Sequence, residues 1–439
     1  MKSSYKADSI TLAGAIAMGT GVMIGAGIFA LTGQIAELAG PLFPLSFVLG
    51  AMVSGFSAHA YIKMSNAFPS AGGVAMILQK AYGRNFIAVG AALLMVLSMV
   101  ISESLVARTF GSYALRGLQI EDMAYLVPVL GVGLIVVAYV INASGNRSVG
   151  LVSTIMSTLK IGGIVVFGVA AIWASGISLA STGSQALDRT TAGFLGSVAL
   201  AILAFTGFTT ITNSGAEITE PHRNVGRSII WSIGTCIAVY LLVALAVGSS
   251  LTLAEIVEAK DYSLAEAARP AFGDAGLYLT VLLSVIATAS GLIASIFAVS
   301  RMLAMLTEMH LIPHRHFGLP GGVRDHTLIY TVVIATFLTI FFDLGRIASL
   351  GAFFYLVMDV IIQWGVFRHL RQEIGASAPT LLVAIGLDVV VLGAFASLKW
   401  YGDPEIVIIA LTSIVAVFAW QRFYLSRTSY DRTKGHRHL

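Results

Sequence analysis

The stretch Gly-Thr-Gly-Val-Met-Ile-Gly-Ala-Gly-Ile-Phe-Ala-Leu-Thr-Gly at residues 19–33 lies inside the first long apolar segment of the chain. Five of its fifteen residues are glycine, and a glycine inside a helix costs about 1 kcal/mol relative to alanine. A broken helix in hydrocarbon also exposes backbone groups that protein or a polar cavity must satisfy. We therefore predict that Ile24–Gly27 is unwound near the bilayer centre and offers its backbone to a small polar solute. The alternative is a glycine-rich packing face for a neighbouring helix.

The composition indicates a helical membrane protein. Of the 439 residues, 57% are hydrophobic and 11% are charged, whereas a soluble domain has about 25% charged residues. The alternation typical of a β-barrel is absent from the sequence. The single cysteine, Cys236, excludes an internal disulfide and a cysteine-based metal cluster, and the short polar N-terminus gives no sign of a cleaved signal peptide.

Apolar stretches of about 20 residues are long enough to span a bilayer. Twelve such spans are predicted in one compact domain covering residues 1–439, at 10–32, 42–66, 85–111, 124–142, 150–175, 193–216, 228–249, 275–305, 327–343, 347–368, 378–398 and 404–424. Of the 26 Lys and Arg residues, 18 fall in segments on the side of the termini and six in the opposite loops. This asymmetry predicts that both termini are cytoplasmic and that the protein lies in the cell membrane. The same loop distribution argues against a nucleic-acid partner, and the basic tail at 425–439 is a cytoplasmic topology signal.

The sixth predicted span contains a second weak stretch, Phe205-Thr206-Gly207-Phe208-Thr209-Thr210, which polar residues follow. Spans 1 and 6 are thus both interrupted, five spans apart. Interruptions at corresponding positions of two halves indicate a transporter site built from inverted repeats. This pairing favours a solute site over simple packing at the first interruption.

Several motifs together resemble the amino acid–polyamine–organocation permeases, and within them most nearly the archaeal proton-coupled amino-acid permeases. They are GVMIGAGIF at 21–29, FPSAGGVAMILQKAYG at 68–83, INASGNRSVGLVSTIMSTLK at 141–160, FTGFTTITNSGAEITEPHRNVGRSI at 205–229 and SRMLAMLTEMHLIP at 300–313. The chain departs from many relatives at Thr209, where they carry Glu, and at Gly226, where they carry Pro. The first departure argues against acid-dependent coupling from span 6.

The resemblance implies an all-α, leucine-transporter-type fold with twelve transmembrane helices and discontinuous helices 1 and 6. Its first inverted repeat of five helices covers 10–175 and its second covers 193–368. Two extra helices follow at 378–424.

An α-amino acid carries a carboxylate and an ammonium close together, and the unwound spans offer partners for both. The N-terminal end of a half-helix at Gly25, Ala26 and Gly27 supplies free N–H groups for the carboxylate. Carbonyl groups around Ile24 and Phe205–Thr206 would take the ammonium. Gly207 and Phe208 complete the expected site, with Phe205 or Phe208 as an aromatic gate or, alternatively, as lipid-facing filler. A bulky residue at Gly25 or Gly27 should block binding and leave the protein folded.

Lys160 lies about ten residues into span 5, where a charge is costly. In the permeases that the chain resembles, the matching lysine fills the place of a sodium ion. The resemblance implies that its ammonium bridges span 1 near Gly21 to a hydroxyl of span 8, with Ser290 as the candidate. Two roles stay open, a proton-exchanging group and a permanently charged strut.

Other ionisable groups also fall within predicted spans. Glu103 is a candidate substrate or proton site, with a purely structural role slightly favoured. Asp359 is similar, Asp388 is a further example, and His59 is expected to be structural. Glu103 and Arg108 are five residues apart and do not form the usual i,i+4 pair.

The sequence predicts a secondary transporter that imports amino acids, with neutral ones preferred, together with protons. Its expected partners are this small-molecule substrate, protons and the lipid bilayer, with no protein partner. The alternatives are an exchanger or uniporter with Lys160 as a strut, and a non-transporting amino-acid receptor. No Walker loop, His-Glu-x-x-His or nucleophile elbow occurs, so no enzyme activity, cofactor or metal site is predicted.

Overall fold

The computed structural model describes residues 9–70, 72–119, 123–144, 146–179, 191–309, 311–312 and 322–435. Within these ranges it describes the backbone alone for Ala26, Glu308, Arg324 and residues 146–158 and 427–435. Residues 436–439 of the predicted basic tail therefore lie outside the described residues, as do parts of several loops between the predicted spans.

Helices make up nearly all of the described chain, and none of its residues belongs to a strand longer than the isolated bridge between Ile10 and Ile218. The α-helices are α1 (Leu12–Met23), α2 (Ala26–Ala39), α3 (Phe43–Ala67), α4 (Gly73–Tyr82), α5 (Phe86–Gly117), α6 (Leu126–Ala143), α7 (Asn146–Ser175), α8 (Thr191–Phe205), α9 (Phe208–Asn213), α10 (Pro221–Ser250), α11 (Leu253–Glu258), α12 (Ser263–Ala267), α13 (Arg269–Glu308), α14 (Val323–Phe341), α15 (Leu344–Gly365), α16 (Ala378–Gly402) and α17 (Pro404–Gly435).

Nine helical stretches among the described residues are long and apolar enough to cross a membrane. Three shorter apolar helices accompany them, Leu12–Met23, Leu159–Ser175 and Asp325–Phe341. The count differs from the predicted twelve because α1 is separate and short while α2 continues into α3 as the stretch Gly27–Ala67, and because the apolar parts counted for α7 and α14 fall below the length of a span. The nine stretches agree with a polytopic membrane protein, and the number of spans remains a prediction.

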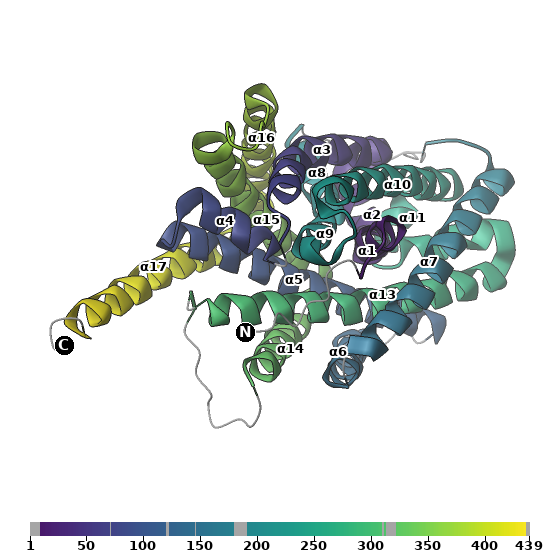
Figure 1. Ribbon diagram of the computed structural model, residues 1–439. Coiled ribbons are helices and arrows are strands. Elements are labelled where there is room, and N and C mark those ends of the chain that lie inside the picture. The colour runs from purple at the N-terminus through teal and green to yellow at the C-terminus, as the bar shows by residue number, and fades with distance from the viewer. Residues whose placement is uncertain are drawn as a thin grey trace.

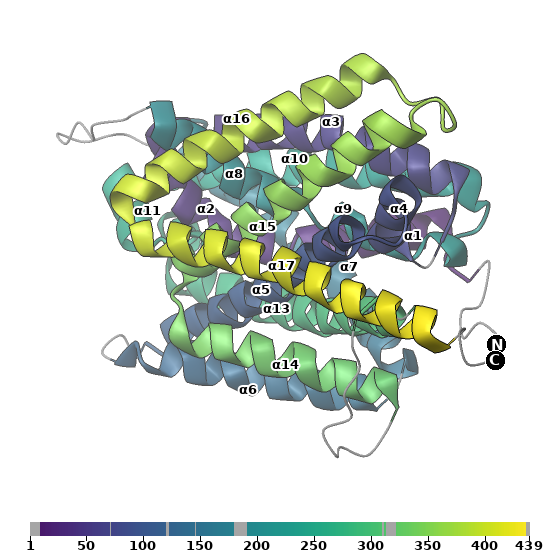
Figure 2. The same cartoon turned by 90° about the vertical axis from the view of Figure 1, so that its left-hand side faces the viewer.

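The broken helices lie in the middle of the molecule and unbroken helices surround them. Figure 1 shows α1 beside α9, with α10 and α7 on one side and the long α13 crossing below. Figure 2 shows α16 and α17 on the outside, where α17 crosses in front of α15, and α6 lying along α14 at the lower edge. Long helices therefore surround α1, α2 and α8 and pack against them.

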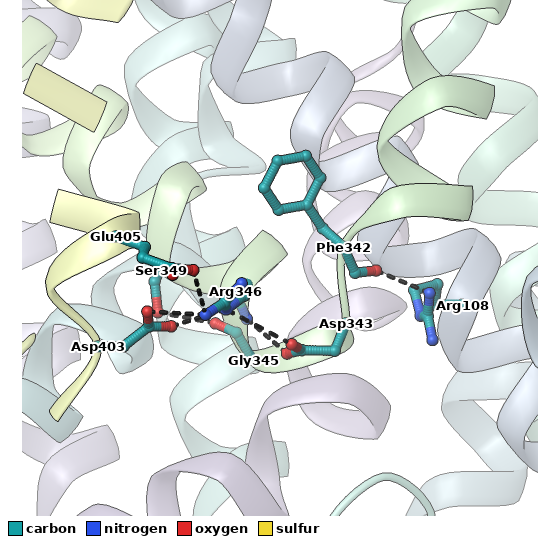
Figure 3. Close-up of polar contacts among 8 residues, drawn as sticks. All are labelled: Arg108, Phe342, Asp343, Gly345, Arg346, Ser349, Asp403 and Glu405. Carbon is teal, nitrogen blue, oxygen red and sulfur yellow. Dashed lines mark hydrogen bonds and ion pairs between the residues drawn. The ribbon is translucent and has the colours of Figure 1, made fainter. Parts of the chain in front are cut away.

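The α14–α15 junction is held to the α16–α17 turn by one arginine (Figure 3). The Arg346 guanidinium donates to both carboxylate oxygens of Asp403 at 2.8 and 2.9 Å, and to Glu405 at 3.0 Å. Asp343 begins α15 by accepting the N–H of Arg346 at 2.9 Å. On the other side, Arg108 of α5 donates to the carbonyl of Phe342 at 2.7 Å, beyond the end of α14. A bidentate arginine fixes orientation as well as distance, so this junction is rigidly placed.

The segment before α1 is tied to the chain that follows α9. The N–H groups of Ser9 and Ile10 both lie 2.9 Å from the carbonyl of Glu217, and Thr219 returns a bond to the carbonyl of Ile10 at 2.9 Å. The Glu217 carboxylate also accepts from Arg301 of α13 at 2.6 Å. The start of the first interrupted region and the end of the second are thus joined to α13.

Candidate functional site

The first break separates α1 from α2 at Ile24 and Gly25. Ile24 has φ −79° and ψ 59° and Gly25 has φ −140° and ψ −100°, so neither continues the helix. The N–H of Gly25 turns back to the carbonyl of Met23 at 2.9 Å. The bond that a continuous helix would form from the N–H of Ile28 to the carbonyl of Ile24 is absent, and no other described group bonds to either. The N–H of Ile28 and the carbonyl of Ile24 are therefore unpaired at this break, next to the positive end of the α2 dipole.

The second break separates α8 from α9 at Thr206 and Gly207, and hydroxyl groups largely repair it. The N–H and Oγ1 of Thr206 both donate to the carbonyl of Leu203, at 3.3 and 2.9 Å. The carbonyl of Thr206 accepts from the N–H and Oγ1 of Thr209, at 3.1 and 2.8 Å. A ligand ammonium would have to compete with both of these bonds, so the predicted use of the Thr206 carbonyl stays a prediction. Gly207 keeps near-helical angles, and no described group accepts its N–H.

Tyr240 of α10 joins the two breaks. Its phenol oxygen lies 2.6 Å from the carbonyl of Met23 and 3.0 Å from the carbonyl of Ala204, at the last turns of α1 and α8. The Tyr240 ring also packs on Phe205, with ring centroids 5.0 Å apart. Tyr240 is not among the site residues predicted from the sequence. A fully buried tyrosine in the middle of an apolar span needs a hydrogen-bond partner, and that requirement was the signal that could have found it.

The glycines at the breaks have different surroundings. A Cβ at Gly25 would find its nearest neighbours at 3.4–3.8 Å, an ordinary contact distance. A Cβ at Gly27 would lie 2.5 Å from the Tyr240 phenol oxygen, and one at Gly207 would lie 2.7 Å from Cγ of Met23. The expectation that a larger residue at Gly27 leaves the fold intact is therefore wrong, because Gly27 is a point of close helix contact. Gly25 alone has room for a side chain. For Ala26 the structure describes only the backbone, at the first residue of α2.

Phe205 and Phe208 are both fully buried. Phe208 meets the ring of Tyr61 of α3 edge-on, with centroids 5.2 Å apart and an interplanar angle of 79°. Neither phenylalanine faces lipid, so the lipid-facing alternative is wrong for both. The aromatic gate at Phe205 or Phe208 stays a prediction.

Lys160 of α7 is buried, with 1% of its surface exposed. Its ammonium donates to the carbonyl of Gly21 and to Oγ of Ser290, the latter at 3.2 Å. Ser290 in turn donates to the carbonyl of Ala287 at 3.1 Å. The structure thus brings the three predicted residues together and ties α7 and α13 to α1, three residues before its break.

Glu103 lies away from these contacts, at the interface of α5 and α13. It is fully buried, and Oε1 accepts from Oγ of Ser295 at 3.3 Å. Its Oε2 has no hydrogen-bond partner in the described chain. Arg108 instead donates to the carbonyls of Thr339 and Phe342, so the two residues make separate contacts as their spacing predicts. In the regions that the structure describes, no three His, Cys, Asp or Glu side chains converge as a metal site would need.

A polar turn between α11 and α12 caps the far end of α2. Lys260 forms an ion pair with Glu37 at 2.8 Å, and Gln34 donates to Asp261 at 2.8 Å. Burial raises the pKa of Asp261 above its ordinary value, although Lys260 and Arg108 act in the opposite direction. A Cβ at Gly33 would overlap the Lys260 backbone, so this turn lies directly against α2 and fixes its position.

A sequence model described as the amino acid permease family matches residues 10–428, nearly the whole chain. The chain belongs to the amino acid permease family. It is 27% identical over 389 residues to the inner membrane transport protein YbaT of Escherichia coli, which covers 88% of this chain and 89% of that protein. It is 26% identical to an uncharacterized protein of Methanocaldococcus jannaschii, over 90% of each chain. It is 25% identical to the methylthioribose transporter of Bacillus subtilis, over 86% of this chain and 84% of that one.

This permease is therefore a multi-pass membrane transporter and not an enzyme. Membership of the permease family explains why the two breaks lie inside the bundle, where protein and not lipid surrounds their exposed backbone. The particular nearness to archaeal proton-coupled members, the solute and the driving ion remain predictions.

Proposed function

We propose that this permease imports amino acids across the cell membrane by alternating access and that a proton gradient drives the import. In this proposal twelve helices span the membrane with both termini in the cytoplasm. Residues 10–175 and 193–368 form two inverted repeats that move against each other, with the helices of 378–424 outside them. The paired breaks at Ile24–Gly25 and Thr206–Gly207 support it, because half-helix ends at a repeat interface are typical of such sites.

The substrate is proposed to bind through its backbone. Its carboxylate would accept from the N–H of Ile28, at the start of α2, and from the N–H of Gly207. Its ammonium would donate to the carbonyl of Ile24. The side chain would lie against Phe208, with Phe205 and Phe208 closing over the bound solute. These surroundings are apolar, which favours neutral amino acids over cationic ones; Glu103 becomes a substrate ligand only if a cationic amino acid is carried.

Lys160 is the proposed proton carrier, and its contacts are the observation that carries the proposal. The ammonium is held by Gly21 of the broken helix and by Ser290 of α13. Movement of α1 relative to α7 and α13 would separate these oxygens from the ammonium and admit water. A proton drives transport only if its binding differs between the two states. Lys160 meets this condition when its partners are present in one state and absent in the other.

Transport into proteoliposomes with an imposed pH gradient tests the proposal. Wild-type protein should accumulate labelled amino acid when the outside is acidic, with or without sodium. Lys160→Ala and Lys160→Arg should both lose this accumulation, and the arginine variant should retain more binding, since arginine keeps the charge and does not deprotonate in proteins. Lys63→Ala, which removes a lysine of α3 that has no ion pair with any described residue, is the control and should behave as wild type.

The alternatives give different results in the same vesicles. Accumulation that persists in Lys160→Arg would leave Lys160 a strut, and exchange without accumulation would indicate an exchanger or uniporter. Failure of labelled substrate to enter by counterflow would favour a receptor. Uptake that needs sodium and ignores pH would contradict proton coupling.

The substrate class has its own test. One relative is named for methylthioribose, so that compound belongs in a thermal-shift panel beside the twenty amino acids. Ligands that prefer the folded protein raise its midpoint of unfolding. A ligand present at a hundred times its dissociation constant raises the free energy of unfolding by about 2.7 kcal/mol. We expect neutral amino acids to give the largest shifts. A shift by methylthioribose alone would overturn the amino-acid assignment and leave the transport class intact.

A further inference from the structure

Two buried carboxyl groups face each other where α15 meets α16, outside the contacts of Lys160. Asp359 of α15 and Asp388 of α16 are both fully buried. The two side chains are close enough to interact directly, across the contact between α15 and α16. Both oxygens of Asp388 nevertheless lack a donor among the described residues. Two ionised carboxylates only accept, so a bond between them exists only when one of them carries a proton.

The partners of Asp359 show which member of the pair is ionised. Oδ1 accepts from the Tyr61 phenol at 2.6 Å, and Oδ2 accepts from the Ser57 hydroxyl. Gln363 donates to the carbonyl and to Oγ of Ser57, at 2.8 and 3.1 Å, and so directs the serine proton toward Asp359. Two hydroxyl donors favour a carboxylate at Asp359. Asp388, with no other donor, is then the member that carries the proton and donates it to Asp359.

No cation compensates the pair. Neither carboxyl forms an ion pair with a Lys, Arg or His within the described ranges. Besides each other, the titratable groups that interact electrostatically with the two carboxyls are Tyr61 of α3 and Tyr355 of α15. Two adjacent negative charges without a cation inside the protein would be strongly unfavourable. A single shared proton removes one of them.

We infer that Asp359 and Asp388 form a proton-binding site that is separate from Lys160, with the proton on Asp388 and the negative charge on Asp359. The ligand is a proton and not a metal cation, because only two carboxyl groups converge here among the described residues and two hydroxyls already donate to one of them. Buried ionisable groups in membrane spans are costly, and a functional role is the default expectation for them.

Tyr61 connects this carboxyl pair to the second helix break. Its phenol donates to Asp359 while its ring meets Phe208 edge-on. A displacement of Phe208 would therefore move the Tyr61 hydroxyl and remove one of the two donors that stabilise the Asp359 carboxylate. The proton shared with Asp388 would then redistribute. The use of this site in transport rests on the proposed function, whereas the shared proton itself does not.

Infrared spectroscopy of the purified full-length permease tests the shared proton without any transport assay. A protonated carboxyl group has a C=O stretching band that a carboxylate lacks and that shifts in D₂O. Asp388→Asn should remove one such band, and its amide can still donate to Asp359, which keeps the fold. Asp359→Asn should retain the band at a shifted position, because the acceptor of the Asp388 proton changes. Glu103→Gln, which removes a buried carboxyl elsewhere, should leave the Asp388 band in place.

Each contrary result has a defined meaning. Loss of the band in Asp359→Asn and retention in Asp388→Asn would overturn the assignment of the proton to Asp388. No loss in either variant would overturn the site, and disappearance of the band when sodium replaces potassium at constant pH would make it a cation site. Tyr61→Phe keeps the ring contact and should shift the band without removing it. If vesicle uptake proves independent of pH while the Asp388 band behaves as expected, the proposed coupling fails and the site stands.

Discussion

The two helix breaks differ in how their backbone groups are satisfied. At Ile24–Gly25 the angles leave the helical region, and the N–H of Ile28 and the carbonyl of Ile24 stay unpaired. At Thr206–Gly207 the angles stay near helical and two threonine hydroxyls take up the free carbonyls. The first break keeps an unpaired N–H and an unpaired carbonyl, whereas at the second break the threonines take up the carbonyls and the N–H of Gly207 stays unpaired. Interruptions that look alike in sequence can therefore differ in which backbone groups they leave unpaired.

Glycine substitutions should separate the breaks most clearly. Gly207→Val should destabilise the permease by about 3 kcal/mol, the upper part of the range for overpacking, because its Cβ would lie 2.7 Å from Cγ and 2.9 Å from N of Met23. Gly25→Val should keep most of the stability and lose substrate binding. Thermal unfolding in detergent, with and without amino acid, measures both. Equal loss of stability in the two variants would remove the distinction between the breaks.

Tyr240→Phe should have an intermediate effect. The substitution keeps the ring against Phe205 and removes the hydroxyl that lies between the carbonyls of Met23 and Ala204. Loss of one buried donor costs about 1–3 kcal/mol. The missing hydroxyl should also partly relieve the crowding in Gly27→Ala, because the Gly27 Cβ would lie 2.5 Å from that oxygen. A double-mutant cycle on unfolding midpoints measures this coupling, and purely additive effects would contradict the contact.

Thr209→Val should have the smallest effect. The valine has nearly the shape of threonine but cannot donate to the carbonyl of Thr206. Side-chain hydrogen bonds in membrane proteins average about 0.6 kcal/mol, so a stability loss of that order is expected with substrate affinity unchanged. A large loss of affinity in equilibrium binding would mean that the Thr209 hydroxyl also contributes to solute binding.

The sequence predicts the features that follow from the cost of polar groups in hydrocarbon. Glycines and threonines inside apolar spans mark both breaks, and a lysine in the middle of a span has to find oxygen partners, which Gly21 and Ser290 supply. The local sequence pattern does not predict how one helix is rotated against its neighbour. Gly25 and Gly27 are two residues apart, yet only the packing of α10 and α8 shows that one is open and the other crowded.

Longer-range pairings were harder still to predict. Asp359 and Asp388 each read as an isolated intramembrane acid, and only the contact between α15 and α16 makes them a pair. The partners of Tyr240 could not be predicted, because they are main-chain carbonyls, which every residue possesses. Interactions with the backbone leave little trace in the sequence, since the partner's side chain is free to vary.

The single cysteine of this chain gives the permease a built-in reporter. Cys236 is fully buried on α10, close enough to Lys160 for the thiol and the ammonium to influence each other electrostatically. A thiol-reactive dye should leave it unlabelled while the helices stay closed around it, and should modify it only when water reaches the lysine. Labels for distance measurements can also be introduced on the surface without first removing a competing thiol. The rate at which the Cys236 thiol is modified would then measure how often the transporter opens.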